Sequence, residues 1–294
     1  MLTSIIVPAH NSEKTLEQCL KSVLLQDGIN FEVIVVDNKS TDKTKEIIEK
    51  LQRADKRIKY VFEPRQGRGA ARNAGINSAK GEIIAMTDSD CVVPKNWLKT
   101  LISPIIFENE KAVMGGDREM FSNFWTKNLQ KKHNATFDRL SDGKYINIVD
   151  TKNFALKTDE AKKIMFDSNL CSLEDVDFYM RSKKKFKIRF LKDLKVFHHH
   201  RTTFLKVFLR KFEYGFSASQ IYKKNSYDKS LLKTEIFGSL DWKNYFKFPV
   251  WIFIKLLKTP PGEVFYTLIY ESAWRAGALY GFLFFKYPNQ ENHN

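Results

Sequence analysis

The sequence contains few cysteines, three in 294 residues, and they stand far apart at positions 19, 91 and 171. This spacing indicates neither a disulfide framework nor a paired-cysteine metal site, and it favours buried thiols in a reducing compartment. The chain also lacks internal repeats and low-complexity segments. Its first eight residues carry neither a basic leader nor a long apolar core, so a secretory signal is not predicted and we expect a cytoplasmic location.

Acidic residues are scarce in the second part of the chain. Residues 1–117 carry 17 Lys and Arg against 16 Asp and Glu, whereas residues 118–294 carry 32 against 18. Such an excess of cations indicates an acidic partner, for which nucleic acid, an anionic membrane surface and a phosphorylated acceptor all qualify, or else a solvated lysine-rich face. No nucleic-acid recognition motif accompanies the charge, so we do not expect nucleic acid as the partner.

Long apolar runs without charges are absent as well. Residues 248–254 are too few to cross a bilayer, and residues 264–285 approach spanning length but include Glu271 and Arg275, which are spaced to pair on one helix face. An interfacial helix, a helix docked on the protein and a membrane span stay open as interpretations. Residues 202–225, which come before these runs, are basic and rich in aromatic residues. Together the three segments favour a helical extension over residues 216–294 that associates peripherally with the inner face of the cell membrane.

Short apolar runs alternate with amphipathic segments over roughly the first 90 residues. Strands are predicted at residues 4–7, 31–36, 58–62 and 82–86, with helices between them. This alternation is typical of βαβ units and predicts an α/β fold with a mostly parallel sheet flanked by helices. We expect Pro8 to close the first strand, Asn11 and Ser12 to cap the first helix, and Ser40 or Thr41 to cap the second.

Beyond Pro94 the alternation lapses. We expect helices at residues 97–107, 121–140 and 172–182, a strand and turn at 112–116, and strands at 145–149, 151–157, 188–191 and 194–197.

Two carboxylates one residue apart, Asp88 and Asp90, follow the strand predicted at 82–86. In open α/β sheets ligands bind outside the carboxyl ends of the strands, so this pair is expected in a binding crevice. Carboxylate oxygens there favour a hard cation, because Mg²⁺ and Mn²⁺ are typically held by one or two carboxylates plus the phosphates of a substrate. The alternative is a solvated turn or helix cap, since acids after a strand are common.

Six short stretches occur in a fixed order along the chain. They are residues 4–11 (SIIVPAHN), 35–42 (VVDNKSTD), 67–75 (GRGAARNAG), 87–90 (TDSD), 173–181 (LEDVDFYMR) and 196–201 (VFHHHR). Together they resemble family 2 glycosyltransferases of the GT-A fold. The resemblance covers about residues 1–215, with a nucleotide-sugar half at 1–117 and an acceptor half at 118–215. It implies an inverting transfer from a nucleotide-diphosphate sugar that depends on a divalent metal.

By this resemblance the first stretches bind the nucleotide sugar. The implied residues are Pro8, Ala9, His10, Asn11, Asp37, Asn38, Gly67, Arg72 and Asp88. His10 offers a stacking face for the base, and Arg72 a planar cationic fork for a carbonyl or phosphate. The family more often has two aspartates where this chain has Asp37 and Asn38. Because an amide also donates, the base is left open, with a UDP-sugar as the first expectation.

The glycine spacing at residues 67–75 differs from that of a dinucleotide-binding fingerprint, so we do not expect a dehydrogenase.

The same resemblance implies a metal site for Mn²⁺ or Mg²⁺. Its expected ligands are Asp90, His198 or His200, and Asp88, which would face the ribose or the metal-bound waters. Histidine beside a carboxylate is compatible with Mn²⁺ and less typical of Mg²⁺. On a strand His198 and His200 share a face while His199 points away, so the sequence does not decide between the two.

Asp175 is the expected general base, with Glu174 beside it. An inverting displacement needs a carboxylate opposite the leaving group, within reach of the acceptor hydroxyl. Glu174 would raise the pKa of Asp175 if both faced the pocket, or would bind acceptor hydroxyls. The alternative is that these acids, with Asp177, stabilise the N-terminus of a helix after Ser172.

The predicted function is therefore transfer of a sugar to a hydroxyl or phosphate acceptor, lipid-linked or polysaccharide, at the cytoplasmic membrane face. A processive polysaccharide synthase is an alternative, but the sequence has neither several spanning helices nor a Gln-x-x-Arg-Trp tract near the histidines. A non-catalytic nucleotide-binding scaffold of the same fold is another. The presence of Asp90, Asp175 and His198 together argues against it.

Overall fold

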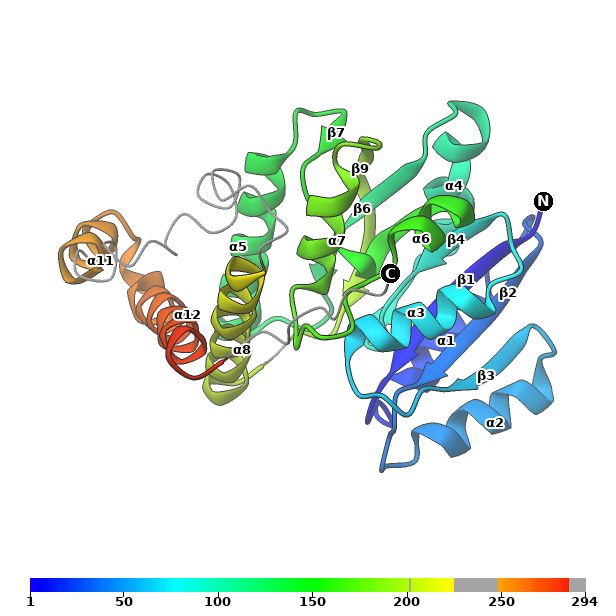
Figure 1. Ribbon diagram of the computed structural model, residues 1–294, viewed down its shortest axis with the longest axis horizontal. Helices are drawn as coiled ribbons and strands as arrows, with labels where there is room; N and C mark the ends of the chain where they lie inside the picture. Colours follow the sequence, from blue (N-terminus) through cyan, green and yellow to red (C-terminus); the bar gives the residue numbers. More distant parts are fainter. Residues whose placement is uncertain (201, 225–247, 286–294) are drawn as a thin grey trace, which may run out of the picture. The chain divides into compact units, whose positions relative to one another are not determined.

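The computed structural model describes residues 1–200, 202–224 and 248–285 of the chain (Figure 1). Contacts along the chain divide it into two compact units. Unit 1 comprises Met1–Ser122, Leu129–Asn169 and Glu174–His200, and unit 2 comprises Asn123–Asn128, Leu170–Leu173 and Arg201–Asn294. By this division the sheet-bearing unit ends at His200, and a functional boundary at residue 215 stays a prediction.

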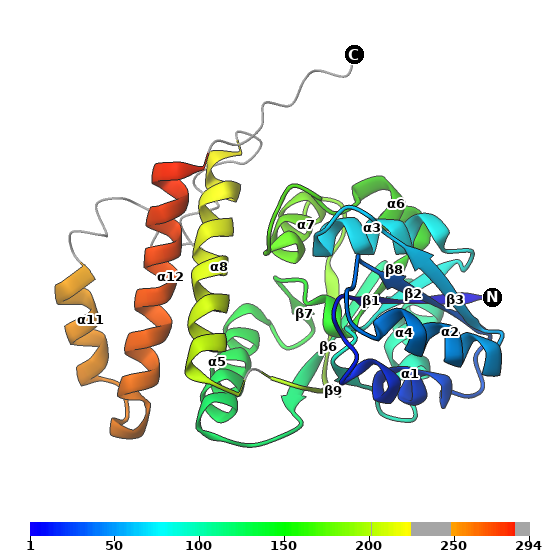
Figure 2. The same cartoon turned by 90° about the horizontal axis from the view of Figure 1, so that it is seen from below.

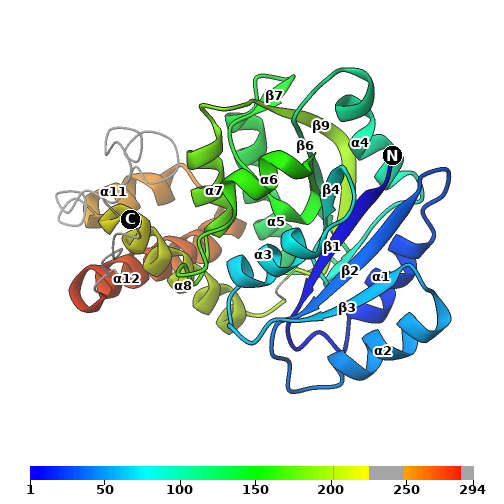
Figure 3. The ribbon, with the colours of Figure 1, turned by 45° about the vertical axis from the view of Figure 1, so that its right-hand side comes forward.

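Four parallel strands form the first half of the sheet in unit 1, in the order β3-β2-β1-β4 (Figure 3). They are β1 (Thr3–Ala9), β2 (Phe31–Asp37), β3 (Ile58–Phe62) and β4 (Ile83–Met86), connected through α1 (Leu16–Leu24), α2 (Thr44–Ala54) and α3 (Arg68–Ser78). The predicted βαβ units are confirmed. Because the chain moves outward from β1 to β3 and then returns to place β4 on the other side of β1, a topological switch point lies between β1 and β4.

Helices cover both faces of these strands, which explains why β1, β2 and β4 are buried along almost their whole length. Strand β2 is buried at every position. On one face Val7, Val33 and Trp97 belong to a single apolar core. On the other face α3 approaches so closely that a Cβ atom on Gly75 would lie 2.5 Å from Cγ2 of Ile6.

The second half of the sheet is mixed. Strand β8 (Phe154–Lys157) lies antiparallel to both β4 and β6 (Ala112–Glu119), and β6 runs parallel to β9 (Ile188–His198). Strands β5 (Cys91–Val92) and β7 (Tyr145–Ile146) each lie antiparallel to β9. The two strands expected at 188–191 and 194–197 are one strand, whose pairing with β6 shifts register between Gly115 and Gly116.

The remaining elements before residue 200 are helices and one 3-10 turn. They are α4 (Trp97–Phe107), α5 (Phe124–Leu140), α6 (Thr158–Ile164), α7 (Glu174–Ser182) and η1 (Thr151–Asn153). Helix α4 has the predicted bounds. The sequence does not predict α6 or β5, and the strand expected at 151–157 begins only at Phe154 because η1 precedes it.

Two capping predictions are wrong. The Ser12 hydroxyl does not cap α1 but lies 2.8 Å from the hydroxyl of Ser89, and the Ser40 hydroxyl accepts the backbone N–H of Asn11. Pro8 does not close β1, which pairs with β2 as far as Ala9. The hydroxyls of Ser12 and Ser40 therefore connect neighbouring loops and do not cap a helix.

Unit 2 contains α8 (Phe204–Lys223), α11 (Phe248–Leu257), η2 (Pro261–Glu263) and α12 (Val264–Phe284). Helices α8 and α12 lie side by side (Figure 2). A Cβ atom on Gly215 would lie 1.8 Å from the carbonyl oxygen of Trp274, so the two backbones are in direct contact there. The expected pair forms on α12, where Arg275 Nη1 lies 2.9 Å from Glu271 Oε2.

None of the helices described is both long enough and apolar enough to cross a membrane.

Candidate active site

The loops that follow β1, β2 and β4 meet at one edge of the sheet, in front of the switch point. Nδ1 of His10, which is exposed, lies 2.8 Å from the carbonyl oxygen of Asn38 and so joins the first two loops. The pair of hydroxyls from Ser12 and Ser89 joins the β1 loop to the β4 loop. Buried Ala9 ends β1, and its carbonyl accepts the N–H of Asn38.

Asp37 is a buried carboxylate at the end of β2. Its Oδ1 accepts the N–H of Ser40 at 3.0 Å, and its Oδ2 accepts the hydroxyl of Tyr60 at 3.2 Å. Asn11 has a positive φ of 49°, and its side-chain oxygen accepts the N–H of Thr41 at 2.9 Å. Asp37 and Asn11 therefore fix the shape of the same loop from two sides.

Asn38 is committed to the loop that precedes α3. Its amide donates to the carbonyl oxygens of Glu63 and Arg65, and its oxygen accepts the N–H of Gly67 at 2.8 Å. Gly67 has a φ of 139°, which a residue with a side chain rarely adopts. The amide donors of Asn38 are thus directed at the loop.

Arg72 connects two acidic motifs that lie far apart in the sequence. This buried guanidinium donates through Nη2 to Asp88 Oδ1 at 3.0 Å and through Nη1 to Glu174 Oε1. Burial disfavours the charge of Arg72, but the carboxylates of Asp88, Glu174 and Asp175 outweigh it and raise the pKa of Arg72. The guanidinium of Arg72, which the sequence suggests for binding a phosphate or carbonyl, therefore faces carboxylates of the protein itself.

Asp175 follows Glu174 in the first turn of α7 and is partly buried. Burial raises the pKa of Asp175 to about 7, and the negative charges of Glu174 and Asp150 add to this effect. A carboxyl group with a pKa near neutrality accepts a proton more readily than an ordinary aspartate does. This environment suits a general base.

Asp90 and His198 face each other beside the short β5–β9 pairing. Nε2 of His198 lies 3.4 Å from Oδ2 of Asp90, and Cys91 is directly opposite His198 in the strand register. One donor atom from each of these three residues lies within 4.8 Å of the others. A carboxylate beside an imidazole fits Mn²⁺ better than Mg²⁺. Burial opposes protonation of His198, but Asp90 and Asp117 outweigh it and raise its pKa to about 9.

His200 belongs to a different group. Its Nε2 lies 2.8 Å from Oε1 of Gln130 and 3.6 Å from Oδ2 of Asp117, and among the described residues it forms a second potential ligand set with Asp117 and His133. Burial, with His198 and His133 adding to it, lowers the pKa of His200 to about 2, so this ring is neutral. The structure thus brings His198 to both Asp90 and Asp117, and His200 to Asp117.

Sequence reasoning missed Cys91, Asp117, His133 and Lys152. Burial opposes ionisation of Asp117, but Lys152 and His133 outweigh it and hold the pKa of Asp117 well below its usual range. The sequence shows Asp117 only as an acid directly after Gly115 and Gly116. The residues next to it in the sequence do not indicate which side chains it contacts. Their proximity depends on the pairing of β6 with β9.

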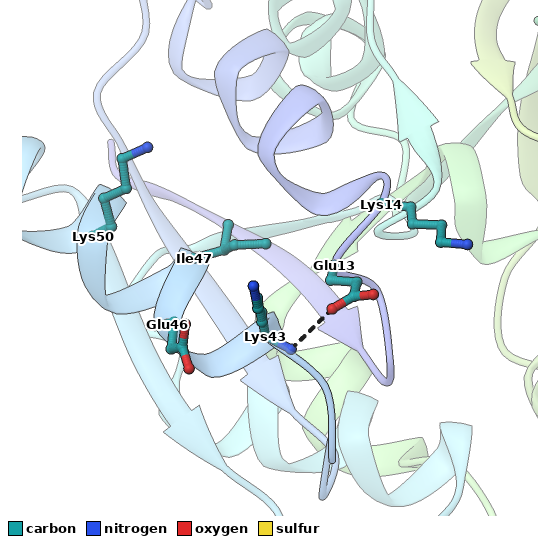
Figure 4. A pocket seen from close by; sticks show the side chains of 6 residues that line it. All are labelled: Glu13, Lys14, Lys43, Glu46, Ile47 and Lys50. Carbon is teal, nitrogen blue, oxygen red and sulfur yellow. Dashed lines mark hydrogen bonds between the residues drawn. The ribbon is translucent and has the colours of Figure 1, made fainter.

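An open hollow of about 450 Å³ lies elsewhere on unit 1, between α2 and the loop that precedes α1 (Figure 4). It is lined by Glu13, Lys14, Lys43, Glu46, Ile47 and Lys50. None of the predicted site residues lines it.

The strand order, the acidic end of β4 and the helices on both faces of the sheet define a glycosyltransferase of the GT-A fold. The sequence profile of glycosyl transferase family 2 matches residues 4–173, and the chain belongs to this family.

Glycosyltransferase GlyG of Streptococcus pneumoniae serotype 4 is 36% identical to the chain over 115 residues, which are 39% of this chain and 38% of GlyG. The chain therefore spans well under half of that relative. Glycosyltransferase AglE of Haloferax volcanii is 26% identical over 263 residues, covering 88% of this chain and 82% of AglE.

Among solved structures, the mannosyltransferase PcManGT from Pyrobaculum calidifontis, in complex with GDP-Man and Mn²⁺, superposes with a TM-score of 0.72. At 17% identity, the alignment covers 95% of this chain and 86% of that chain. The predicted fold is confirmed.

Proposed function

We propose that this glycosyltransferase moves a sugar, with inversion, from a nucleotide-diphosphate sugar to a hydroxyl or phosphate acceptor, and that the reaction depends on a divalent metal. The supporting observation is the chain of charged groups from Asp88 through Arg72 to Glu174 and Asp175. Asp88 comes from the donor side and Asp175 from the predicted acceptor side. A UDP-sugar is the first candidate donor.

The donor lies, in this proposal, along the carboxyl ends of β1, β2 and β4. Asp37 retains acceptor capacity for an N–H of the base because each of its oxygens accepts one hydrogen bond. Pro8, Ala9, His10 and Asn11 frame the base, and Gly67 allows the loop before α3 to approach the donor closely.

Asp90 and His198 are the proposed metal ligands, and Asp88 faces the ribose or the metal-bound waters. A divalent cation held there would neutralise the negative charge that develops on the departing nucleoside diphosphate. PcManGT was solved with Mn²⁺ and its nucleotide sugar.

Asp175 is the proposed base. Its carboxylate takes the proton from the acceptor oxygen as that oxygen bonds to the anomeric carbon of the sugar. The bond between the anomeric carbon and the diphosphate oxygen breaks at the same time, so the nucleoside diphosphate leaves from the opposite face. Arg72 contributes by holding Glu174 and Asp88 in fixed positions.

The first experiment is thermal stabilisation of the parent chain and of Asp90→Ala by UDP and GDP, each with and without Mn²⁺. A ligand at about 100 times its Kd should add roughly 2.7 kcal/mol to the free energy of unfolding. We expect one nucleotide to stabilise the parent only with Mn²⁺, and Asp90→Ala to lose that effect.

Asp175→Asn separates catalysis from binding. This variant should keep the metal-dependent stabilisation and lose release of the nucleotide from its sugar. A parent that binds the nucleotide with metal but releases none of it from the candidate nucleotide sugars would favour the scaffold hypothesis.

We also propose that unit 2 associates with the surface of an anionic membrane and that the acceptor is lipid-linked. Its helices carry many large apolar side chains that are exposed, namely Phe204, Leu205, Leu209, Val250, Phe253, Ile254, Leu257, Phe265, Leu268, Leu279, Tyr280, Leu283 and Phe284. Exposed apolar surface of this extent marks interaction sites. Lys206 on α8 and Lys258, directly after the end of α11, are exposed and would attract anionic lipid.

Vesicle flotation tests this association, using phosphatidylcholine alone and phosphatidylcholine with phosphatidylglycerol. The parent should float with the anionic vesicles, and the double variant Leu283→Ser with Phe284→Ser should float less. Phe107→Ser is the matched control, because Phe107 is 81% exposed on α4. Self-association without vesicle binding would instead assign the apolar face to a second copy of the chain.

A further inference from the structure

The carboxylate of Asp117, on β6, is surrounded by side-chain nitrogen atoms. Its Oδ2 lies 3.4 Å from Nδ1 of His133, 3.6 Å from Nε2 of His200, and 3.7 Å from both Nζ of Lys152 and Nδ1 of His198. The Asp117 side chain is only 1% exposed. A buried carboxylate needs such partners, because a charge taken out of water is costly unless it is paired.

His198 lies between two carboxylates. Its Nε2 faces Asp90 at 3.4 Å, and its Nδ1 faces Asp117 at 3.7 Å. Within the described part of the chain, Nδ1 of His198 has no hydrogen-bond partner, and neither has Oδ1 of Asp117. Both nitrogens of this ring therefore face a carboxylate: Nε2 faces Asp90, whose side chain is 40% exposed, and Nδ1 faces Asp117, whose side chain is buried.

We propose that Asp117 is a positioning residue for His198. When a cation takes the place of the proton on Nε2, Asp117 would keep the remaining proton on Nδ1 and so leave the Nε2 lone pair for the cation beside Asp90. Metal-bound histidines usually donate their other N–H to a carboxylate or carbonyl, which fixes the tautomer and the ring orientation. This inference rests on the metal-dependent transfer proposed above, and it gives a role to a residue outside the six motifs.

Asp117 could instead hold a second ion with His133 and His200. Two contacts argue against that use. The ammonium group of Lys152 already lies 3.7 Å from Asp117 and also pairs with Asp150, so the protein balances the buried charge. Nε2 of His200 lies 2.8 Å from Oε1 of Gln130, so this nitrogen already has a partner within the protein. We therefore expect one bound metal per chain.

The test titrates Mn²⁺ into the full chain with the stabilising nucleotide present and follows free Mn²⁺ by electron paramagnetic resonance. The parent should bind one Mn²⁺. Asp117→Asn should bind Mn²⁺ about 10- to 100-fold more weakly, the usual effect of removing such a supporting group. Asp138→Asn is the matched control, because Asp138 is exposed and pairs with Lys192 at the surface, and it should bind like the parent.

A second measurement on the parent, with His198→Gln used only to assign signals, tests the inference if Asp117→Asn does not fold. Long-range ¹H–¹⁵N correlation spectra with Zn²⁺, a diamagnetic ion that imidazole binds well, report which ring nitrogen carries the proton. The His198 signals are those that disappear in His198→Gln. Protonated Nδ1 supports the inference, and protonated Nε2 overturns it.

The outcomes separate this inference from the proposed function. A parent that binds no Mn²⁺ with either nucleotide contradicts the proposed function and removes the inference with it. Equal Mn²⁺ affinity in the parent and in folded Asp117→Asn contradicts the inference alone. Two Mn²⁺ ions per chain, the second lost in Asp117→Asn, would also overturn it in favour of a second ion.

Discussion

Arg72 on α3 and Glu174 on α7 form a buried ion pair across 102 positions of sequence, and both side chains are only 3% exposed. The second arm of the guanidinium holds Asp88 at 3.0 Å. A motif expected to bind the donor is thus joined to the motif expected to activate the acceptor. Loss of either charge would leave the other buried without this partner.

Arg72→Met should destabilise unit 1 strongly. Removing one member of a buried pair leaves an uncompensated charge, which typically costs 3–5 kcal/mol, so we expect a loss of about 4 kcal/mol in the free energy of unfolding. Urea denaturation measures this. Lys21→Met is the control, since Lys21 is 64% exposed in its pair with Glu17 and its loss should cost less than about 1 kcal/mol.

The double variant Arg72→Met with Glu174→Met should recover part of that stability, because neither charge is then left alone in the core. If the two single losses simply added, the pair would not be the cause.

The rate of transfer should fall on acidification with a midpoint near pH 7. The proposed base must be ionised, and burial with help from Glu174 raises the pKa of Asp175 to about 7. The pH profile of kcat/KM measures this midpoint. Glu174→Gln should move the midpoint to lower pH, whereas Asp159→Asn, on an exposed side chain of α6, should leave it in place. An unchanged midpoint in folded Glu174→Gln would remove Glu174 as a cause.

Asp175 should also make stability depend on pH. Its pKa in the folded chain lies above its ordinary value of 3.8, so the folded state binds the proton more tightly than the unfolded state. The stability from this group is complete below about pH 4 and is lost as the pH rises through 7. Asp175→Asn has no such loss. Its melting temperature should therefore exceed that of the parent at pH 8, and the difference should shrink toward pH 4.

The regular part of the fold could be predicted because its signals are local. Helix α4 and strand β3 have their predicted bounds, since each is set by an apolar pattern within about a dozen residues. Strand β9 was divided in two because the polar residues Lys192 and Asp193 interrupt its apolar pattern. In the structure the strand passes through them, and its ladder with β6 shifts register.

The supporting residues of the candidate site could not be predicted in this way. Cys91 meets His198 only through the β5–β9 pairing, and Asp117 meets Lys152 and His198 only because β6 and β9 are neighbours. Asn38 shows the opposite case. Its position after a strand suggested a contact with the base, but its hydrogen bonds hold the loop to Gly67. The motifs therefore predict which loops carry the polar residues, whereas the contacts of those residues depend on which strands are neighbours in the sheet.

Gly277→Ala should destabilise the α8–α12 pair, although alanine is the better helix former. A Cβ atom at Gly277 would lie 1.9 Å from the carbonyl oxygen of Phe212, and backbone cannot give way as a side-chain end does. Overpacking of this kind costs about 1–3 kcal/mol or more. Gly262→Ala is the control, because a Cβ atom there has nothing within 4 Å. Thermal unfolding followed by circular dichroism should show a lower transition for the first variant alone. A higher transition in Gly277→Ala would mean that helix propensity outweighs the close contact.

His198→Ala and His199→Ala should differ sharply although the residues are neighbours. The His198 ring faces Asp90, whereas His199 points to Gln18 and packs against Phe121. Removing a metal ligand should weaken Mn²⁺ binding by at least about tenfold, since even the groups that support such ligands contribute 10- to 100-fold. His199→Ala should bind Mn²⁺ like the parent. Calorimetric titration with the nucleotide present measures both. The opposite result, in which His199→Ala loses Mn²⁺ binding and His198→Ala keeps it, would contradict the proposed ligand set. It would mean that the end of β9 rotates when the donor binds and that His199 is the ligand.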